Sequence, residues 1–198
     1  MRTTRLATAV LLVAAVAAAP LAAGTYTFDP THSSIGFAVT HLGLSKVRGE
    51  FGEYEGTVEL DPENLTASSV EVSIVTSSID TGNEQRDGHL RSGDFLLAAE
   101  HPTIEFSSTA VESLGGSEYA VTGDLTIRGV TQEVTIPVTL LGPVTGMRGE
   151  KRIGVEGGLT IDRHDFGVSW SRTLDAGGLV VGDEVDIVLN VEAVSSDG

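Results

Sequence analysis

Apolar and polar side chains alternate along most of this chain with a period of two, which is typical of β-strands that bury one face. The last such segment, residues 185–192, is the clearest, with Val, Ile or Leu at every odd position. Eight segments of this kind predict eight strands, at residues 26–41, 45–60, 70–76, 103–114, 118–127, 130–141, 152–161 and 185–192.

The connections between the predicted strands favour an antiparallel barrel or sandwich, so the expected fold class is all-β. Gly115-Gly116 and Arg128-Gly129 separate neighbouring strands, and glycine tolerates the positive φ of such hairpin turns. Glycines within the segment 45–60 mark bends that a closing sheet needs. Pro137 is expected at a bulge or an edge, because proline cannot donate a ladder hydrogen bond.

The predicted inward faces consist largely of Val, Ile, Leu and Gly, and aromatic residues make up only 5% of the chain. An eight-stranded barrel has an interior that is either filled by side chains or holds one small ligand. Small aliphatic side chains leave room inside such a barrel. The composition therefore favours a cavity, and a solid core stays open as the alternative.

One segment, residues 83–95, interrupts the alternation and is dense in charge. Its charged and titratable residues include Arg86, Asp87, His89, Arg91 and Asp94. A break of this kind in an all-β chain is expected to fold across one end of the sheet, as a lid or a recognition rim. A solvated connector is the alternative. Arg86 is the best candidate to bind a polar headgroup, because its planar guanidinium can hold two oxygens at once.

The N-terminus has the composition of a secretory signal peptide. Arg2 and Arg5 precede an apolar run at residues 6–19, and a region of small residues follows. We expect residues 1–23 to be removed, which would release a single domain, residues 24–198, into the periplasm or the medium. An uncleaved anchor is the alternative, although the run is shorter than the about 20 apolar residues that a membrane span needs.

Charge and cysteine content exclude several classes of partner and chemistry. The formal net charge is −16, and removal of Arg2 and Arg5 would bring it to −18. Such a surface repels nucleic acid phosphates and anionic lipid headgroups, so we expect no nucleic acid partner and no stable membrane insertion after cleavage. The chain has no cysteine, which rules out disulfides and a thiol nucleophile, and the domain must depend on its core alone.

The sequence contains no strong catalytic or metal-binding motif. Its five histidines lack the HExxH and i,i+4 spacings of zinc sites, and no Gly-x-Ser-x-Gly elbow is present. We therefore expect no metal, no cofactor and no catalysis, with metal ligands from separate strands as the remaining option. Asp87 and His89 could imitate an acid/base pair, although residues two apart in a polar loop more often form a local hydrogen-bond network.

A series of motifs runs in order through the mature domain. They are Asp29-Pro-Thr-His-Ser with Ile35-Gly-Phe and His41, Val47-Arg-Gly-Glu-Phe-Gly with Gly56, Ile79-Asp-Thr, Arg86-Asp-Gly-His-Leu-Arg-Ser-Gly-Asp-Phe, His101-Pro-Thr-Ile-Glu-Phe-Ser-Ser, Gly123-Asp-Leu-Thr-Ile-Arg-Gly-Val-Thr, Asp162-Arg-His-Asp-Phe-Gly and Val181-Gly-Asp-Glu-Val. This series resembles the YceI-like family of exported polyisoprenoid-binding proteins, over residues 25–194. The chain departs from the family pattern at Asp162, where an Asn is common, and at Tyr26, where a Trp is frequent.

The resemblance implies an eight-stranded, antiparallel, lipocalin-like barrel with one short helical insertion at about residues 83–97. It also implies an apolar tunnel for a long-chain lipid of the polyisoprenoid or isoprenoid quinone class, bound without catalysis for transport or storage. An apolar lipid is then the main partner, and a homodimer is one option for the assembly. An enzyme that uses Asp87 and His89 on an apolar substrate stays as one alternative, and a solid-cored structural or stress protein as another.

The candidate ligand-binding residues combine inward positions of the strands with polar groups of the charged segment and of the late motif. They are His32, Phe37, Val39, His41, Phe51, Arg86, Asp87, His89, Phe95, Ile104, Phe106, Arg163 and Trp170. The two histidines of the first strand, with Arg86 and His89, are expected at the tunnel or its mouth. Phe37 and Val39 are expected to point inward together with Ile187 and Leu189, and the first and last strands are expected to pair and close the barrel.

Overall fold

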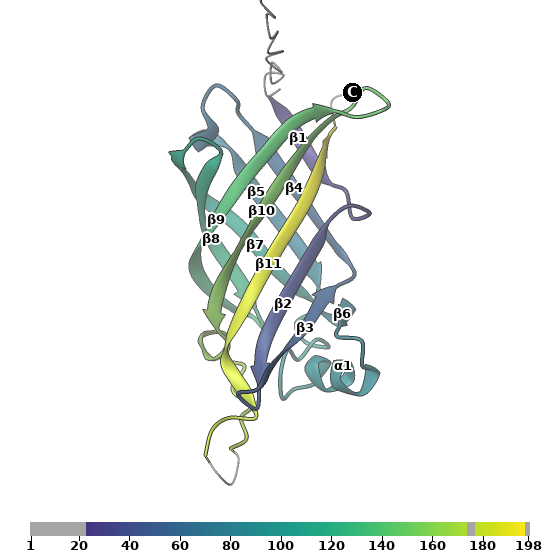
Figure 1. The fold of residues 1–198 in the computed structure, drawn as a ribbon, viewed down its shortest axis with the longest axis vertical. Helices are drawn as coiled ribbons and strands as arrows, with labels where there is room; N and C mark the ends of the chain where they lie inside the picture. Colours follow the sequence, from purple (N-terminus) through teal and green to yellow (C-terminus); the bar gives the residue numbers. More distant parts are fainter. Residues whose placement is uncertain (1–22, 174–176, 197–198) are drawn as a thin grey trace, which may run out of the picture.

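The computed structural model describes residues 23–173 and 177–196, so all of the expected signal peptide but its last residue lies outside the described part. Within these residues, eleven strands form one antiparallel sheet (Figure 1). The strands are β1 (Gly24–Phe28), β2 (Ser34–His41), β3 (Ser45–Phe51), β4 (Tyr54–Leu60), β5 (Ser69–Val75), β6 (Ile79–Asp80), β7 (Thr103–Gly115), β8 (Glu118–Ile127), β9 (Val130–Thr145), β10 (Lys151–Asp162) and β11 (Val181–Ser195). The helical elements are α1 (Glu84–Arg91) and the short 3₁₀ helices η1 (Leu65–Ala67), η2 (Thr76–Ser78) and η3 (Arg163–Phe166).

The strands close into a barrel because β11 pairs with both of the first two strands. β1 pairs with residues 193–195 of β11, and β2 pairs with residues 181–190. β4 and β3 continue this arrangement on the other side, against β1 and β2 respectively. β1 and β2 together therefore occupy one position of the barrel, and β3 and β4 together occupy the next. With β5, β7, β8, β9, β10 and β11 this makes eight positions, so the predicted eight-stranded antiparallel barrel is confirmed. β6 is a short addition beside β3.

The segment 45–60, expected as one strand, bends at Gly52 and forms β3 and β4. The Gly52 amide leaves the ladder and donates to the carbonyl oxygen of Ser78 at 3.1 Å. Two other glycines of the segment make room for aromatic rings, because a Cβ at Gly49 or Gly56 would lie about 2.5 Å from the ring of Phe37 or Phe28. The glycines therefore permit both the bend and the close packing around it.

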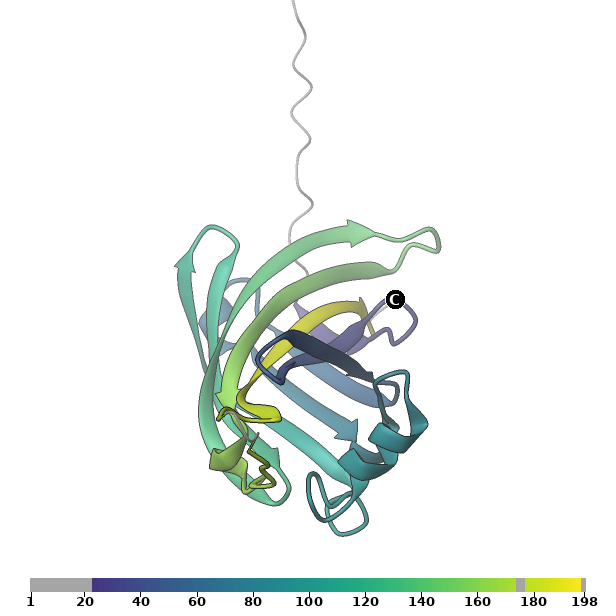
Figure 2. The same ribbon diagram turned by 60° about the horizontal axis from the view of Figure 1, so that its bottom comes forward.

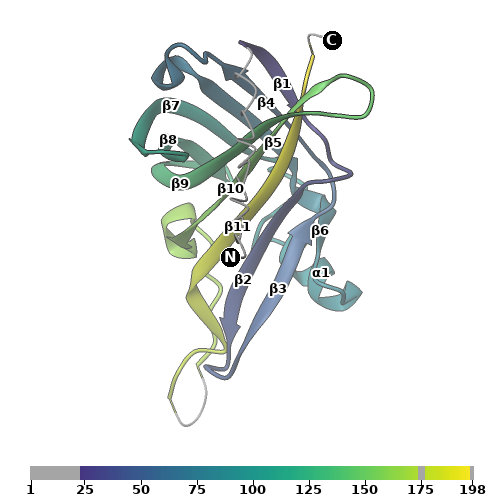
Figure 3. The ribbon, with the colours of Figure 1, turned by 45° about the horizontal axis from the view of Figure 1, so that its top comes forward.

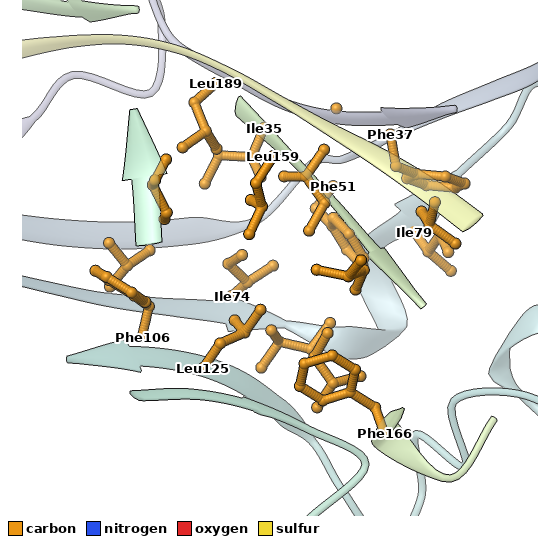
Figure 4. A pocket seen from close by; sticks show the side chains of 18 of the residues that line it. Ile35, Phe37, Phe51, Ile74, Ile79, Phe106, Leu125, Leu159, Phe166 and Leu189 are labelled. Atoms are coloured by element: carbon orange, nitrogen blue, oxygen red, sulfur yellow. The ribbon is translucent and has the colours of Figure 1, made fainter. Parts of the chain in front are cut away.

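The register between β2 and β11 fixes which side chains face the interior. Phe37 lies opposite Ile187, and Ile35 lies opposite Leu189. These residues and Val39 all line the interior of the barrel, as Figure 4 shows for three of them. The predicted inward positions and the predicted pairing of the first and last strands are confirmed.

An apolar cluster fills the end of the barrel at which β1 begins. Tyr26 and Ala193 are fully buried, Ile153 is nearly so, and Val58 and Leu60 complete the cluster. Figure 3 shows this end, with the hairpin of β9 and β10 extending past β11. We call it the closed end of the barrel.

α1 and η3 lie at the opposite end, which we call the mouth (Figure 2). α1 confirms the predicted helical insertion. It begins where the side chain of Asn83 accepts a hydrogen bond from the Arg86 amide, which is a standard helix N-cap. The insertion therefore places the charged segment at the rim of the mouth, on one side of the opening (Figure 2).

η3 fills a split in the barrel wall near the mouth. β9 pairs with β10 only from Val138 onward, so Pro137 lies where this ladder ends, in line with its expected edge position. Phe166 of η3 is 2% exposed and belongs to the main apolar core. The Gln132 side chain donates to the carbonyl oxygen of Asp165 at 2.9 Å and ties η3 to β9.

A network of charged side chains on the outer face of the barrel, near its closed end, holds the turn between β1 and β2. Arg152 of β10 bonds to Asp29 at 2.9 Å and also to Glu150 and Glu192. Asp29 in turn accepts hydrogen bonds from His32 and from the Thr31 amide. The hydrogen bonds from His32 and Arg152 hold the pKa of Asp29 well below its ordinary value.

We expect Asp29→Asn to lower Tm by about 3–8 °C at neutral pH, because the substitution removes the charge that Arg152 and His32 bind. A depressed folded-state pKa adds stability above the unfolded-state pKa of about 3.9, and that stability is lost as the pH falls toward the folded-state value. The difference in Tm between the wild type and this variant should therefore shrink between about pH 4 and pH 2. Thermal melts across this range test the prediction, with Glu55→Gln on the exposed face of β4 as the control. A difference that stays constant with pH would contradict it.

Candidate functional site: the apolar cavity and its mouth

The barrel encloses a cavity of about 490 Å³, lined mainly by Val, Ile, Leu and Phe side chains. This volume lies within the range of small-molecule sites, which is about 300–1,000 Å³. The lining residues run along β11 from Val181 to Val191, which is about 33 Å of strand at 3.3 Å per residue. The cavity is therefore long and apolar, and the solid-cored alternative does not describe this barrel.

Most of the predicted site residues lie on the wall of this cavity. The structure places these eleven there: Phe37, Val39, His41, Phe51, Arg86, His89, Phe95, Ile104, Phe106, Arg163 and Trp170. Phe37 and Phe51 pack with their ring centroids 5.9 Å apart. Figure 4 shows these two rings with Phe106 and the aliphatic side chains around the cavity.

The charged and imidazole groups of the lining gather at the mouth. His41 ends β2, Arg86 and His89 come from α1, and Arg163 begins η3. The middle of the tube is lined by side chains that make no hydrogen bonds, such as Ile74, Leu125, Leu159 and Leu189 (Figure 4). A ligand that fits this distribution has a long apolar part and one polar end.

Three aromatic rings connect α1 to the loop after η3 across the mouth. His89 meets Phe95 and Trp170 edge-on, with centroids 4.9 and 5.5 Å away. Phe95 and Trp170 lie 5.3 Å apart. The His89 ring is also held by Asp94, 2.8 Å from Nε2. The rings thus form an apolar rim with one polar edge.

Arg86 is anchored on one side only. Its Nε donates to Thr81 Oγ1 at 2.7 Å, and Nη2 donates to the Thr81 carbonyl oxygen at 2.8 Å. Within the described residues Nη1 makes no hydrogen bond, and the residue is exposed. The guanidinium therefore keeps donors for another group at the mouth.

Asp87 and His89 do not form the acid/base pair that the enzyme alternative needs. Asp87 is 5% exposed, does not line the cavity, and accepts hydrogen bonds from the amide and hydroxyl of Thr81. His89 is paired with Asp94 instead. The predicted placement of Asp87 at the ligand site is wrong, because its carboxylate is used to hold the start of the insertion.

Arg163 is a buried anchor of the mouth loop. It is 5% exposed, and its donors bond to the carbonyl oxygens of Gly182, Val168 and Trp170 and to Asp183. The hydrogen bond from His164 and the charge of Arg163 hold the pKa of Asp183 below its ordinary value, against the effect of desolvation.

Asp162, the departure from the family pattern, bonds to the His164 amide and caps η3. The extra carboxylate therefore does not bind Arg163. What ties up the guanidinium of Arg163 is a set of backbone carbonyls, which the sequence motif alone does not reveal.

His32 lies outside the cavity, contrary to expectation. Residues 29–33 form a turn rather than strand, and this turn places His32 with Asp29 outside the closed end. Asp29, His32 and Glu192 bring three potential metal-ligand atoms within 4.8 Å of one another. The guanidinium of Arg152 already bonds to both carboxylates, so these groups act as an ion-pair network.

Much of the cavity wall consists of residues that were not among the predicted site residues. Leu125, Leu159 and Ile161 line it, and the alternation in their strands was a sufficient signal to find them. Phe166 and Leu90 line it from helical turns, where a period of two gives no information.

No helix in the described part of the chain is long and apolar enough to cross a membrane.

A closed antiparallel barrel around an apolar cavity, with a helical insertion at the rim of its mouth, defines the structural class of this protein. The sequence model of the YceI-like domain family matches residues 26–193 of this chain. The chain belongs to the YceI-like family.

Relatives of known sequence support this assignment. The chain is 41% identical to a UPF0312 protein of Pseudomonas paraeruginosa and 40% identical to protein YceI of Escherichia coli O157:H7, in each case over 163 residues and 82% of both chains. Among crystal structures, BcnA of Burkholderia cenocepacia is similar with a TM-score of 0.73 and 27% identity, covering 83% of this chain and 98% of its own. A polyisoprenoid binding domain from Saccharophagus degradans shares the fold, with a TM-score of 0.66, 18% identity, and coverage of 86% and 98%.

Proposed function

We propose that this protein binds one long, apolar lipid chain in the barrel, without catalysis, and carries or stores it. The single observation that supports this proposal most strongly is the long apolar cavity whose charged and imidazole groups are confined to the mouth. Each methylene group moved from water into such a cavity contributes about 0.8 kcal/mol. A chain of many methylenes is thus bound tightly with no hydrogen bond along its length.

A polyisoprenoid or an isoprenoid quinone is the ligand class that we propose. The Saccharophagus degradans domain that shares this fold is described as polyisoprenoid binding. A branched, flexible chain suits a wall of Val, Ile, Leu and Phe, which selects for length and shape. The leader-like composition of residues 1–23 supports a role in the periplasm or outside the cell.

Native mass spectrometry after gentle purification tests the proposed function. We expect a stoichiometric adduct with the mass of an apolar lipid, which is lost when the protein is unfolded and extracted with organic solvent. Added polyisoprenoid alcohol should refill the extracted and refolded protein. Turnover of the added lipid would support an enzyme instead, and the absence of both an adduct and refilling would refute the proposal.

Arg86 is the proposed contact for the polar end of the lipid. Its Nη1 is available, and the ring of His41, which lines the cavity, makes no hydrogen bond within the described residues. Arg86→Met keeps an apolar stem and removes the donors. We expect this variant to bind a lipid with a polar headgroup about 10–150-fold more weakly, at the strength of one charge-assisted hydrogen bond of about 1.5–3 kcal/mol.

The same variant separates a headgroup contact from a structural clasp. Its affinity for a hydrocarbon of the same length but without a headgroup should be unchanged. Its Tm should fall by no more than about 2 °C, because the two bonds that Arg86 donates to Thr81 are exposed. Equilibrium titrations and thermal melts measure both. A larger fall in Tm with unchanged affinity would assign Arg86 to holding the insertion through Thr81.

A further inference from the structure

Two loops at the mouth are hydrogen-bonded into one projection. The Leu42 amide of the β2–β3 turn donates to the Val180 carbonyl oxygen at 2.9 Å, and the Val180 amide donates to the Arg172 carbonyl oxygen at 2.8 Å. We call residues 42–44 and 177–180 the mouth lobe. Figure 1 shows the β2–β3 turn and the segment that leads into β11 at the lowest end of the molecule, beyond α1.

The mouth lobe exposes leucine where turns usually carry polar residues or glycine. Leu44 is 85% exposed at the tip of the turn. Leu42 has a φ of 55°, which is uncommon for a residue other than Gly, Asn, Asp or His. Leu179 is partly exposed in the neighbouring segment. The fold thus holds an apolar tip in place at some conformational cost.

The lobe continues directly into the wall of the cavity. His41 and Val181 line the cavity and pair with each other, and Val180 lines it from the lobe itself. A lipid that leaves a bilayer at the lobe would enter the cavity without passing through bulk water. This route avoids the free-energy cost of exposing each methylene group to water.

Cationic side chains lie beside the apolar tip. Arg48 is exposed on β3, and Arg172 is exposed in the loop that bonds to the lobe. Lys46 is also exposed on β3, but its ammonium is paired with Asp186. One guanidinium group can bind two phosphate oxygens at once. An apolar tip flanked by basic side chains is typical of contacts with a bilayer interface. The net charge of −16 opposes approach to a strongly anionic surface. The combination favours a largely zwitterionic phospholipid bilayer as the occupant.

We propose that the mouth lobe docks on the surface of a phospholipid bilayer and inserts Leu44 into the boundary between headgroups and acyl chains. The cavity mouth then opens toward the membrane. Docking of this kind is reversible and peripheral, because one leucine tip and two arginines bind far more weakly than a membrane-spanning helix. The proposal goes beyond the proposed lipid binding and rests on it only for the direction of lipid transfer.

Vesicle flotation with Leu44→Asp tests the docking itself. We expect the fraction of protein that floats with phosphatidylcholine vesicles to fall about fivefold or more relative to the wild type. Met147→Asp is the matched control, because Met147 is at least as exposed and lies in the β9–β10 hairpin at the closed end. It should float like the wild type. Leu44→Trp should float more, since Trp prefers the bilayer interface.

A transfer assay links docking to uptake. Protein stripped of lipid is mixed with phosphatidylcholine vesicles that contain the polyisoprenoid alcohol solanesol. Leu44→Asp should take solanesol from vesicles about fivefold or more slowly than the wild type, yet bind solanesol delivered in ethanol with unchanged affinity. If the wild type does not bind solanesol at all, the proposed function is contradicted. The flotation assay would still test docking, because it does not depend on a bound lipid.

Two outcomes would overturn the docking proposal. One is equal flotation of the wild type, Leu44→Asp and Met147→Asp. The other is a concentration-dependent dimer of the wild type, seen by sedimentation velocity, that Leu44→Asp abolishes while no form of the protein floats. That result would assign the lobe to a second copy of this chain. Unchanged melts of both variants are expected, because both side chains are exposed.

Discussion

Leu189→Trp should weaken lipid binding about 100-fold while leaving the barrel folded. Leu189 of β11 points into the middle of the cavity, beside its partner Ile35 on the adjacent strand β2. An indole ring at this position would fill space that the lipid chain needs. If the ring displaces about four methylene groups at about 0.8 kcal/mol each, the loss is about 3 kcal/mol. Since 1.4 kcal/mol corresponds to a factor of ten, the affinity falls about 100-fold.

The adjacent residue supplies the control for this substitution. Val188 is 48% exposed on the outer face of the same strand, beside Gly36 and Gly158. Val188→Trp adds the same ring at the neighbouring position and should leave the affinity unchanged. Titration with a polyisoprenoid alcohol measures both variants. Equal affinities for the two would show that the lipid binds outside the barrel.

Arg163→Met is expected to lower the free energy of unfolding by about 2–4 kcal/mol, because it removes a 5% exposed guanidinium and leaves the acceptors around it without their donor. The substitution leaves the carbonyl oxygens of Gly182, Val168 and Trp170 without their donor, the one at Val168 buried and the other two partly buried. It also leaves Asp183 with its histidine partner alone. Urea denaturation followed by circular dichroism measures the loss.

Two further variants and one probe sharpen this test. Arg172→Met changes an exposed arginine of the same loop and should shift the free energy of unfolding by less than about 0.5 kcal/mol. Arg163→Lys should recover only part of the loss, because an ammonium lacks the planar fork. Trp170 is the single tryptophan of the chain, so its fluorescence reports on unfolding at the mouth. A loss below about 1 kcal/mol in Arg163→Met would contradict the assignment of Arg163 as an anchor.

Local pattern was enough to predict the strands and their buried faces, because a strand with one buried face has apolar residues at alternate positions. The odd-numbered residues of β11 and their partners in β2 were placed correctly for this reason. The pattern left a barrel and a sandwich open, and the family resemblance favoured the barrel. The bend at Gly52 was not predicted as a break, since a glycine within a strand is compatible with either a bulge or an end. Its amide bonds to Ser78, a contact that no local pattern contains.

The polar site residues were harder to predict than the apolar ones. His32, Asp87 and Arg163 were all chosen by residue type and motif, and each is used to hold a turn or a loop. Whether a charged group faces a ligand or a backbone carbonyl depends on tertiary contacts. Arg86 and His89 are on the wall because the insertion folds at the rim of the mouth, and the loss of alternation did indicate a segment at one end of the sheet.

The pairing of β11 with both β1 and β2 has a consequence for how the chain folds. The first and last strands of the described chain meet, so the contacts that complete the barrel span almost its whole length. Contacts so distant in sequence form slowly, because the entropy of a long loop is lost before they form. A chain that emerges N-terminus first holds β1, β2 and β10 as unpaired edges until β11 arrives, and such edges invite aggregation. Chaperone dependence should therefore concentrate in the interval before the last fifteen-residue strand is available.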